Sequence, residues 1–212
     1  MAGYSYVPTR YHKLHIVYQR YSPKLIACNL SNSLVAEDST WSFDTAGRLD
    51  FYRFSKNDRR AEKIIENGRT CAPLFGARNF APTGTSRFTI LIAKNTKNAI
   101  DSAYGVGVAL ETCSLEKALN WQSCSYMIFV GNFQGTLYSE SIRYTNYLNT
   151  TITEGMNVTT IVDMDGMLPT LRYEVNWKPV GVPWQMNLSP LQRKHLRPAV
   201  ELAWANDTVE LI

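Results

Sequence analysis

The sequence of 212 residues has no apolar run that could span a membrane, which takes roughly 20 consecutive apolar residues. Its N-terminus, MAGYSYVPTRYHKLHIVYQRY, also lacks the apolar core of a secretion signal. The four cysteines, Cys28, Cys71, Cys113 and Cys124, show no CxxC spacing and do not suggest a disulfide framework in a chain of this length. We therefore expect reduced cysteines, no membrane partner and a cytoplasmic location, with a nuclear location still open.

Histidine is also scarce, and neither sign of charge is in large excess. The 22 basic and 18 acidic residues leave a net charge of +4, which is far from the dense basic surface of a dedicated nucleic-acid binder. Arg59, Arg60 and Lys63 form a short basic run, which predicts either a weak phosphate or nucleic-acid patch or, more simply, a solvated loop interleaved with acids. His12 and His15 fall on opposite faces of a predicted strand, which argues against a shared metal.

No local motif marks a catalytic or cofactor site. The segment Asp163–Gly166 begins like a calcium loop, but Pro169 interrupts it and the twelfth position, Glu174, falls in a predicted strand. The glycines of Tyr104–Ala109 lack the third glycine of a dinucleotide fingerprint, which favours a buried strand where two sheets approach closely. Because no nucleophile motif is present either, we expect no enzyme, no metal and no cofactor.

What the sequence does contain is strong two-residue alternation, clearest between Glu154 and Trp184. Apolar and polar residues alternate through Val158–Met164 and again through Leu171–Asn176, with a turn between them. This is the pattern of half-buried strands. A third strand starts at Val180–Val182 and is expected at a sheet edge, because Pro183 has no N–H for a ladder. The stretch therefore predicts three consecutive antiparallel strands.

These strands carry motifs that resemble the SPRY (B30.2-type) domain family. The resemblance covers about residues 41–212, and its fragments stand in the family's order. The matching segments are Leu74–Phe80, Gly84–Ile92, Tyr104–Ala109, Ser125–Tyr126, Gly135–Tyr138, Gly155–Asn157, Thr160–Asp165, Leu171–Asn176, Val180–Trp184, Leu196–Leu202 and Val209–Ile212. Phe88 takes the place of the family's core tryptophan, Trp177 replaces a turn glycine, and the turn at Gly166–Pro169 is longer than usual. The resemblance implies an all-β, two-layer antiparallel sandwich with short helices in its connections.

The resemblance places the domain at residues 38–212 and leaves residues 1–37 as an N-terminal extension. Alternation within the extension predicts at least one strand. Two alternatives remain open: the extension packs on the sandwich as extra strands, or it is a flexible basic and aromatic arm that meets a partner.

Four segments have weaker local patterns. Trp41–Phe43 and Leu49–Phe54 are predicted as strands on either side of a turn. Lys56–Asn67 is charged and is followed by glycine, so it is predicted as a short helix or a long loop. Ser114–Leu119 is predicted as one or two helical turns.

In SPRY domains that bind short peptides, several loops at one end of the sandwich form the pocket. Carried over residue by residue, the resemblance implies that the partner-binding residues of this chain are Arg53, Ser102, Asn120, Trp121, Ala203, Trp204 and Ala205. For Trp204, a pocket residue and a core residue remain equally open. For Trp121, a core position is the favoured alternative, because tryptophan is mostly buried in folded proteins.

The sequence thus predicts an intracellular module that binds a peptide or protein partner through these loops and performs no catalysis. It could be a free-standing adaptor or part of a larger complex, and nucleic acid is not an expected partner. The alternative is a lectin-like sandwich that binds a glycan or a small anionic ligand, since one fold can serve both functions.

Overall fold

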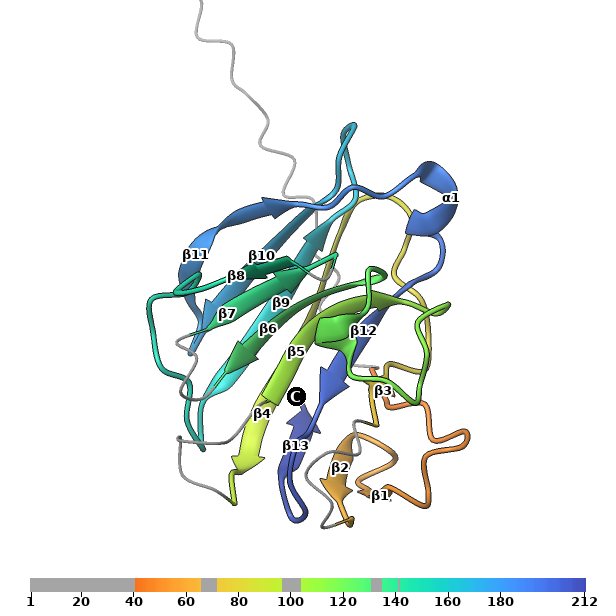
Figure 1. The fold of residues 1–212 in the computed structure, drawn as a ribbon, viewed down its shortest axis with the longest axis vertical. Coiled ribbons are helices and arrows are strands. Elements are labelled where there is room, and N and C mark those ends of the chain that lie inside the picture. Colours follow the sequence, from red (N-terminus) through yellow and green to blue (C-terminus); the bar gives the residue numbers. More distant parts are fainter. Residues whose placement is uncertain (1–40, 66–71, 97–103, 131–134, 141) are drawn as a thin grey trace, which may run out of the picture. The chain divides into compact units, whose positions relative to one another are not determined.

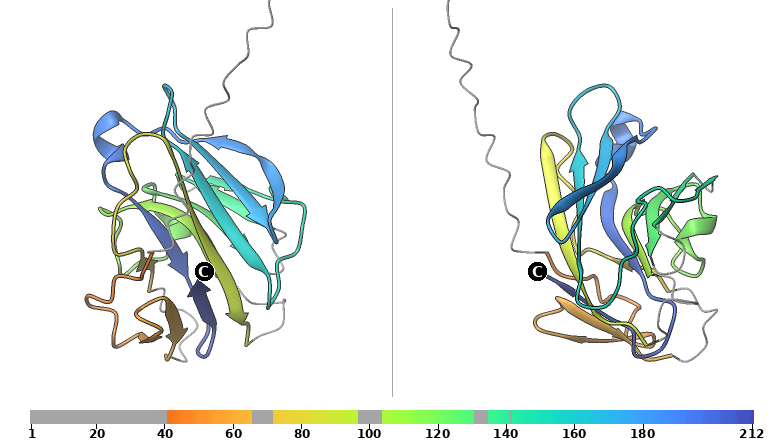
Figure 2. Two further views of the ribbon diagram at one scale, coloured as in Figure 1. Left: turned by 180° about the vertical axis from the view of Figure 1, so that it is seen from behind. Right: turned by 90° about the vertical axis from the view of Figure 1, so that its left-hand side faces the viewer.

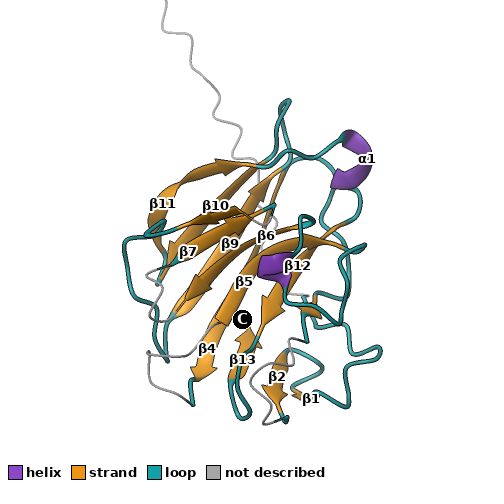
Figure 3. Ribbon diagram, in the orientation of Figure 1, coloured by secondary structure: helices purple, strands orange, loops and turns teal. Residues whose placement is uncertain are grey.

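Two antiparallel β-sheets lie face to face in the part of the chain that the structure describes (Figure 1). The computed structural model describes residues 41–65, 72–96, 104–130, 135–140 and 142–212. The side view in Figure 2 separates the two layers, and Figure 3 shows that nearly all of the regular structure is strand. The predicted all-β, two-layer antiparallel sandwich is confirmed.

The described residues form one sheet of seven strands and one of six. The larger sheet contains, in spatial order, β1 (Tyr52–Ser55), β2 (Arg60–Lys63), β13 (Thr208–Leu211), β4 (Thr85–Lys94), β9 (Asn157–Asp163), β10 (Thr170–Val175) and β11 (Lys178–Gln185). The smaller sheet contains β3 (Leu74–Phe75), β12 (Leu196–Glu201), β5 (Tyr104–Leu110), β6 (Ser125–Val130), β7 (Thr136–Ser139) and β8 (Ile142–Tyr144). Two short helices lie in connections: the 3-10 helix η1 (Leu119–Trp121) and α1 (Pro190–Arg193).

The strands predicted between Glu154 and Trp184 are β9, β10 and β11. They pair antiparallel in that order, with Leu171 opposite Val162 in the β9–β10 ladder. The apolar residues of the alternating pattern face the other sheet and are buried. β11 is the last strand of its sheet, as the proline at position 183 predicted.

The two sheets approach each other closely at β5, which is buried along its whole length. A Cβ atom on Gly107 would lie 2.2 Å from the backbone oxygen of Tyr126 and 3.0 Å from the hydroxyl of Tyr173 in the opposite sheet. That hydroxyl donates to the carbonyl oxygen of Val106 at 3.4 Å. Gly107 therefore allows the close approach of the neighbouring strand β6 as well as of Tyr173 in the other layer, whereas a Cβ on Gly105 would meet only residues of its own sheet.

Several local predictions were wrong. Trp41–Phe43 contributes only an isolated bridge at Phe43, and Leu49–Phe54 begins as a turn, so that β1 starts at its fourth residue. Lys56–Asn67 contains the strand β2, whose partners β1 and β13 stabilise it although its own side chains are mostly charged. The helical turn predicted at Ser114–Leu119 is displaced, because η1 begins at the last residue of that range.

A disulfide that the cysteine spacing did not predict joins Cys113 and Cys124. The two cysteines are 11 residues apart and lie on either side of η1, with their Cα atoms 5.7 Å apart. The chain leaves β5 and returns in the neighbouring strand β6, and the N–H of Leu110 donates to the carbonyl of Cys124 at 2.9 Å. The expectation of reduced cysteines is therefore wrong for this pair. Cys28 and Cys71 lie outside the described residues.

Within the described ranges, no helix is both long and apolar enough to cross a bilayer. The predictions for residues 1–37 lie outside the described residues.

Candidate binding site at the Trp204 loop

The connection between β12 and β13 carries Ala203, Trp204 and Ala205, and all three are half-buried. The N–H of Trp204 donates to Oδ2 of Asp207 at 3.0 Å, and the N–H of Asp207 donates to the carbonyl of Trp204 at 3.2 Å. Asn206 completes this tight turn with a left-handed backbone, φ 66°. Trp204 is therefore neither a core residue nor fully exposed. We call Leu202–Asp207 the Trp204 loop.

A buried lysine supports this loop from within the sandwich. Lys63, the last residue of β2, is 1% exposed, and its Nζ donates to the carbonyls of Leu202 at 2.6 Å and Ala203 at 3.2 Å. Backbone bonds add to this support: the N–H of Lys63 donates to Asp207 at 3.0 Å, and the N–H of Asn206 donates to Lys63 at 2.7 Å. A buried ammonium group is costly unless such partners satisfy it. The position of the loop is thus tied to β2.

Asp207 is the second fully buried ionisable residue here. Its Oδ1 accepts from the N–H of Thr96, just after β4, at 3.0 Å. The hydroxyl of Tyr104 donates to a backbone carbonyl at the end of β4 at 2.5 Å, and burial, together with the nearby Asp207 carboxylate, raises the pKa of Tyr104. We call Lys63, Asp207 and Tyr104 the buried polar cluster. It joins the Trp204 loop to both ends of the β4–β5 connection.

The helix η1 presents a second tryptophan beside the end of β12. The N–H of Leu119 donates to Oε2 of the buried Glu201 at 2.8 Å, and Oγ of Ser125 donates to the carbonyl of Leu119 at 2.5 Å. Trp121 is 76% exposed, so the favoured core position for it was wrong. Oδ1 of Asn120 is buried and has no hydrogen-bond partner among the described residues.

The side chain of Gln122 closes the loop that carries η1. Its Oε1 accepts from the N–H of Ser114 at 2.6 Å, and its Nε2 donates to the carbonyls of Ser114 and Lys117, both at 2.9 Å. These hydrogen bonds and the disulfide both hold this segment in place, and the exposed indole of Trp121 lies on it. We call residues 111–124 the Trp121 loop.

Arg53 lies on the edge strand β1, with its side chain 71% exposed and Nη1 3.7 Å from the carboxylate of Glu62. The register pairs Arg53 with Glu62, and Glu62 with Thr208 of β13. Strand alternation places Arg53 on the sheet face opposite to Lys63. Strands β1 and β2 and the β12–β13 connection lie at one end of the molecule (Figures 1 and 2). Ser102 lies outside the described residues.

The structure therefore brings two of the predicted segments together. The Trp204 loop and η1 both connect to the end of β12, where Glu201 bonds to η1 and Leu202 starts the loop. Arg53 is at the same end but lies on the outer face of the edge strand.

Neither of the two alternatives for the run Arg59, Arg60 and Lys63, a basic patch or, as favoured, a solvated loop, describes all three residues. Lys63 is buried in the cluster described above, and Nη1 of Arg60 pairs with Glu210 at 3.2 Å. Neighbouring side chains of β2 lie on opposite faces of the sheet, and the sequence of this segment alone did not predict a strand there.

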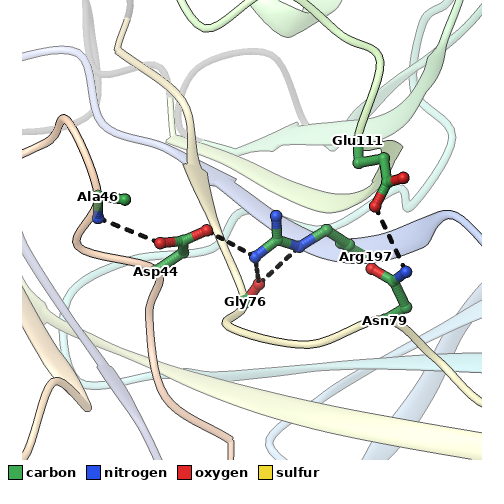
Figure 4. Close-up of polar contacts among 6 residues, drawn as sticks. All are labelled: Asp44, Ala46, Gly76, Asn79, Glu111 and Arg197. Carbon is green, nitrogen blue, oxygen red and sulfur yellow. Dashed lines mark hydrogen bonds and ion pairs between the residues drawn. The ribbon is translucent and has the colours of Figure 1, made fainter.

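A second polar cluster lies at the other end of β12 (Figure 4), and it is more exposed: the side chains of Asp44 and Glu111 are 37% and 39% exposed. Arg197 donates from Nη2 to Oδ2 of Asp44 and from Nε to the carbonyl of Gly76, both at 2.8 Å. Nδ2 of Asn79 is 3.4 Å from Oε2 of Glu111. These bonds fasten the turn after β3 and the segment before β1 to β12.

The same cluster continues to His195, whose Nδ1 lies 2.5 Å from Oε1 of Glu111. This hydrogen bond is the main cause that lowers the pKa of Glu111. A shallow pocket of about 310 Å³ lies beside the pair, lined by Leu110, Glu111, Thr112, Leu191, Gln192 and His195. The described residues contain no group of three or more His, Cys, Asp or Glu that could hold a metal ion. The arrangement fastens α1 to the end of β5, and we assign it a structural role.

Sequence reasoning missed the residues that support the candidate site, namely Lys63, Glu201 and Asp207. All three are charged, and charged residues are rarely fully buried, so a single sequence places them on the surface. The carbonyl and N–H groups that satisfy them come from other strands or loops, which no local pattern identifies.

Comparison with known proteins agrees with this fold. The structure is similar to a solved human SPRY domain, with a TM-score of 0.63 and 17% sequence identity over 80% of this chain and 96% of that one. It is also similar to the PSpry domain of TRIM65, with a TM-score of 0.60 and 11% identity over 81% of this chain and 91% of that one. No family model and no curated protein matches the sequence. The SPRY-like fold implied by the sequence motifs is thus confirmed, and identities this low establish the fold alone.

Proposed function

We propose that this chain is a non-catalytic interaction module that binds a short peptide or protein segment at the Trp204 loop, with Trp121 as a second anchor. One observation carries the proposal: Trp204 is half-buried on a tight turn, and two fully buried ionisable residues, Lys63 and Asp207, hold that turn.

Preorganisation of the two loops favours binding. Tryptophan is among the residues that most often dominate binding energy at protein interfaces. A partner that docks on a mobile loop must also bear the entropic cost of ordering it, whereas a loop that is already fixed avoids this cost. The Trp204 loop and the Trp121 loop are both anchored by several hydrogen bonds, and Arg53 adds an exposed guanidinium at the same end. The likeness to SPRY domains supports this function as a fold-level analogy.

Selection from a peptide library displayed on phage, with the full chain as bait, would test the proposal. We expect enriched peptides whose affinity, measured by calorimetry, falls at least tenfold (about 1.4 kcal/mol) for Trp204→Ala. Trp121→Ala and Arg53→Ala should each cause a smaller loss. Circular dichroism of each variant would verify that the fold is retained.

Trp177→Ala is the matched control. Trp177 is also exposed, but it lies at the β10–β11 turn, near the far edge of the larger sheet, so its loss should leave peptide affinity unchanged. Equal losses for Trp177→Ala and Trp204→Ala would contradict the assignment. A glycan array run in parallel separates the lectin-like alternative: glycan binding that survives Trp204→Ala, without any enriched peptide, would favour that alternative.

A further inference from the structure

A pocket of about 390 Å³ lies between the β1–β2 hairpin and the end of β13, away from the Trp204 loop. It is lined by Lys56, Asn57, Arg59, Glu210, Leu211 and Ile212. The hairpin loop spans the four residues between Ser55 and Arg60, which pair at the strand ends. The N–H of Leu211 donates to the carbonyl of Arg59 at 2.7 Å, so the loop is fastened to β13.

Two cationic side chains, Lys56 and Arg59, line this pocket, and Glu210 is the one acidic side chain among its lining residues. Glu210 accepts from Nζ of Lys56 at 2.5 Å and from Nη1 of Arg60 at 3.2 Å, and these cations, Lys56 first, lower the pKa of Glu210. The Glu210 carboxylate is thus shared by Lys56 in the pocket and by Arg60, which lies outside its lining, and within the described part of the chain it makes no bond to Arg59. Asp58, on the same loop, is exposed and does not line the pocket.

The side chain of Arg59 has no ion pair with Glu210, although the structure describes both residues. Its Nε is buried, yet it has no hydrogen-bond partner among the described residues. Buried polar atoms are almost always hydrogen-bonded, so the unsatisfied Nε shows that the hydrogen bonding of this guanidinium is incomplete. Lys56 also keeps donor capacity, since an ammonium group has three N–H donors and one is used on Glu210.

We propose that this pocket binds an oxyanion, a phosphate or carboxylate group, between the guanidinium of Arg59 and the ammonium of Lys56. A planar guanidinium matches two oxygens of such a group, and the ammonium adds a point charge. The site uses Lys56 and Arg59, whereas the basic run in the sequence pointed to Arg59, Arg60 and Lys63. With so few cations available, binding to a nucleic-acid strand would be weak and only mildly salt-dependent.

The test is an NMR titration of the ¹⁵N-labelled full chain with sodium phosphate, at ionic strength held constant with sodium chloride. A Gly-Ser extension after Ile212 keeps a terminal carboxylate out of the pocket. We expect saturable shifts of the Arg59 Nε–H signal and of the Asn57 and Leu211 amides, with a dissociation constant in the millimolar range. A second titration with sodium acetate identifies the chemistry: saturation by phosphate alone, by acetate alone or by both supports a phosphate, a carboxylate or a general oxyanion site.

Three variants decide whether the shifts report this pocket. Arg59→Gln should abolish saturation at Asn57 and Leu211, and Lys56→Gln should weaken it about fivefold. Lys178→Gln, which removes an exposed cation on β11 at the opposite edge of the larger sheet, should leave it unchanged. If Arg59→Gln fails to fold, Arg59→Lys, which keeps the charge but loses the planar fork, should bind several-fold more weakly. Linear, non-saturating shifts with both anions, or saturation that survives Arg59→Gln, would overturn the proposal.

Discussion

The Trp204 loop and the Trp121 loop meet at the end of β12, but they are held in different ways. The Trp204 loop depends on buried charges: Lys63 comes from β2, and Asp207 bonds to the start of the β4–β5 connection. The Trp121 loop is held mainly from within, by a disulfide and by the amide of Gln122, with Glu201 as its link to β12. The shape of the first loop therefore depends on β2 and on the segment after β4, whereas the second can keep or lose its shape locally.

The strongest test of this difference is Asp207→Ala. The substitution removes the buried carboxylate that accepts from the N–H groups of Thr96 and Trp204. We expect the free energy of unfolding to fall by about 3–5 kcal/mol, because each of these two hydrogen bonds to a charged group contributes about 1.5–3 kcal/mol. Urea denaturation followed by far-UV circular dichroism measures the loss. Asp165→Ala is the matched control: its carboxylate also accepts a backbone N–H, from Gly84, but it is exposed and should matter much less. Equal losses would mean that burial does not distinguish the two aspartates.

Breaking the disulfide should have the next largest effect. Closing a loop of this length stabilises a fold by about 3 kcal/mol in the chain-entropy account. We expect reduction, or the double variant Cys113→Ser and Cys124→Ser, to lower the free energy of unfolding by up to this amount. Hydrogen exchange should quicken in residues 111–124 while the amide of Trp204 stays protected. Equal loss of protection in both loops would contradict the local character of the Trp121 loop. Thiol titration of the unfolded, unreduced chain would report directly whether the bond is present.

The sequence predicted the parts of the fold whose pattern is local. Strands β4, β5, β9 and β10 alternate or run apolar, and they were recognised because burial on one or both faces shapes their composition. β2 was missed because only Ala61 among its four residues is apolar, and Lys63 is buried by carbonyls about 140 residues away in the chain. Hydrogen bonds between residues so far apart in the chain produce no pattern in the local sequence.

The candidate site also has features that the sequence predicted and features that depend on contacts in the folded chain. The position of Trp204 between two alanines was recognisable from the family resemblance, but its half-buried state depends on Asp207 and Lys63 from the folded structure. The exposure of Trp121 was predicted wrongly, because a tryptophan near a helical turn fits a core position equally well. The exposed position of Trp121 follows from the disulfide and the Gln122 hydrogen bonds that close the loop, and these contacts form only in the folded chain.

The hydrogen bonds of Gln122 hold the Trp121 loop alongside the disulfide, and a substitution can remove them alone. Gln122→Ala removes three hydrogen bonds to the backbone of Ser114 and Lys117 while the disulfide remains. We expect a loss of about 1 kcal/mol in the free energy of unfolding, because water can replace part of these bonds in a half-buried site. Hydrogen exchange by mass spectrometry should show faster exchange in residues 111–124 only. Gln185→Ala, at the exposed end of β11, is the matched control and should change neither quantity.

The smallest expected effect belongs to the exposed Glu111–His195 pair, which shows what an ionic contact contributes without burial. The hydrogen bond from His195, assisted by Asn79, lowers the pKa of Glu111 in the folded state below its ordinary value of 4.5. The unfolded chain therefore binds the proton more readily, so the pair stabilises the fold above about pH 4.5, and this contribution disappears as the pH falls through the lowered pKa. Urea midpoints between pH 3 and 7 should show a slightly flatter acid limb for Glu111→Gln than for the unmodified chain. Glu116→Gln, an exposed carboxylate in the Trp121 loop, serves as the comparison variant and should leave the acid limb unchanged. A Glu111→Gln effect of equal size at every pH would mean that packing, and not the charge of Glu111, is what the substitution removes.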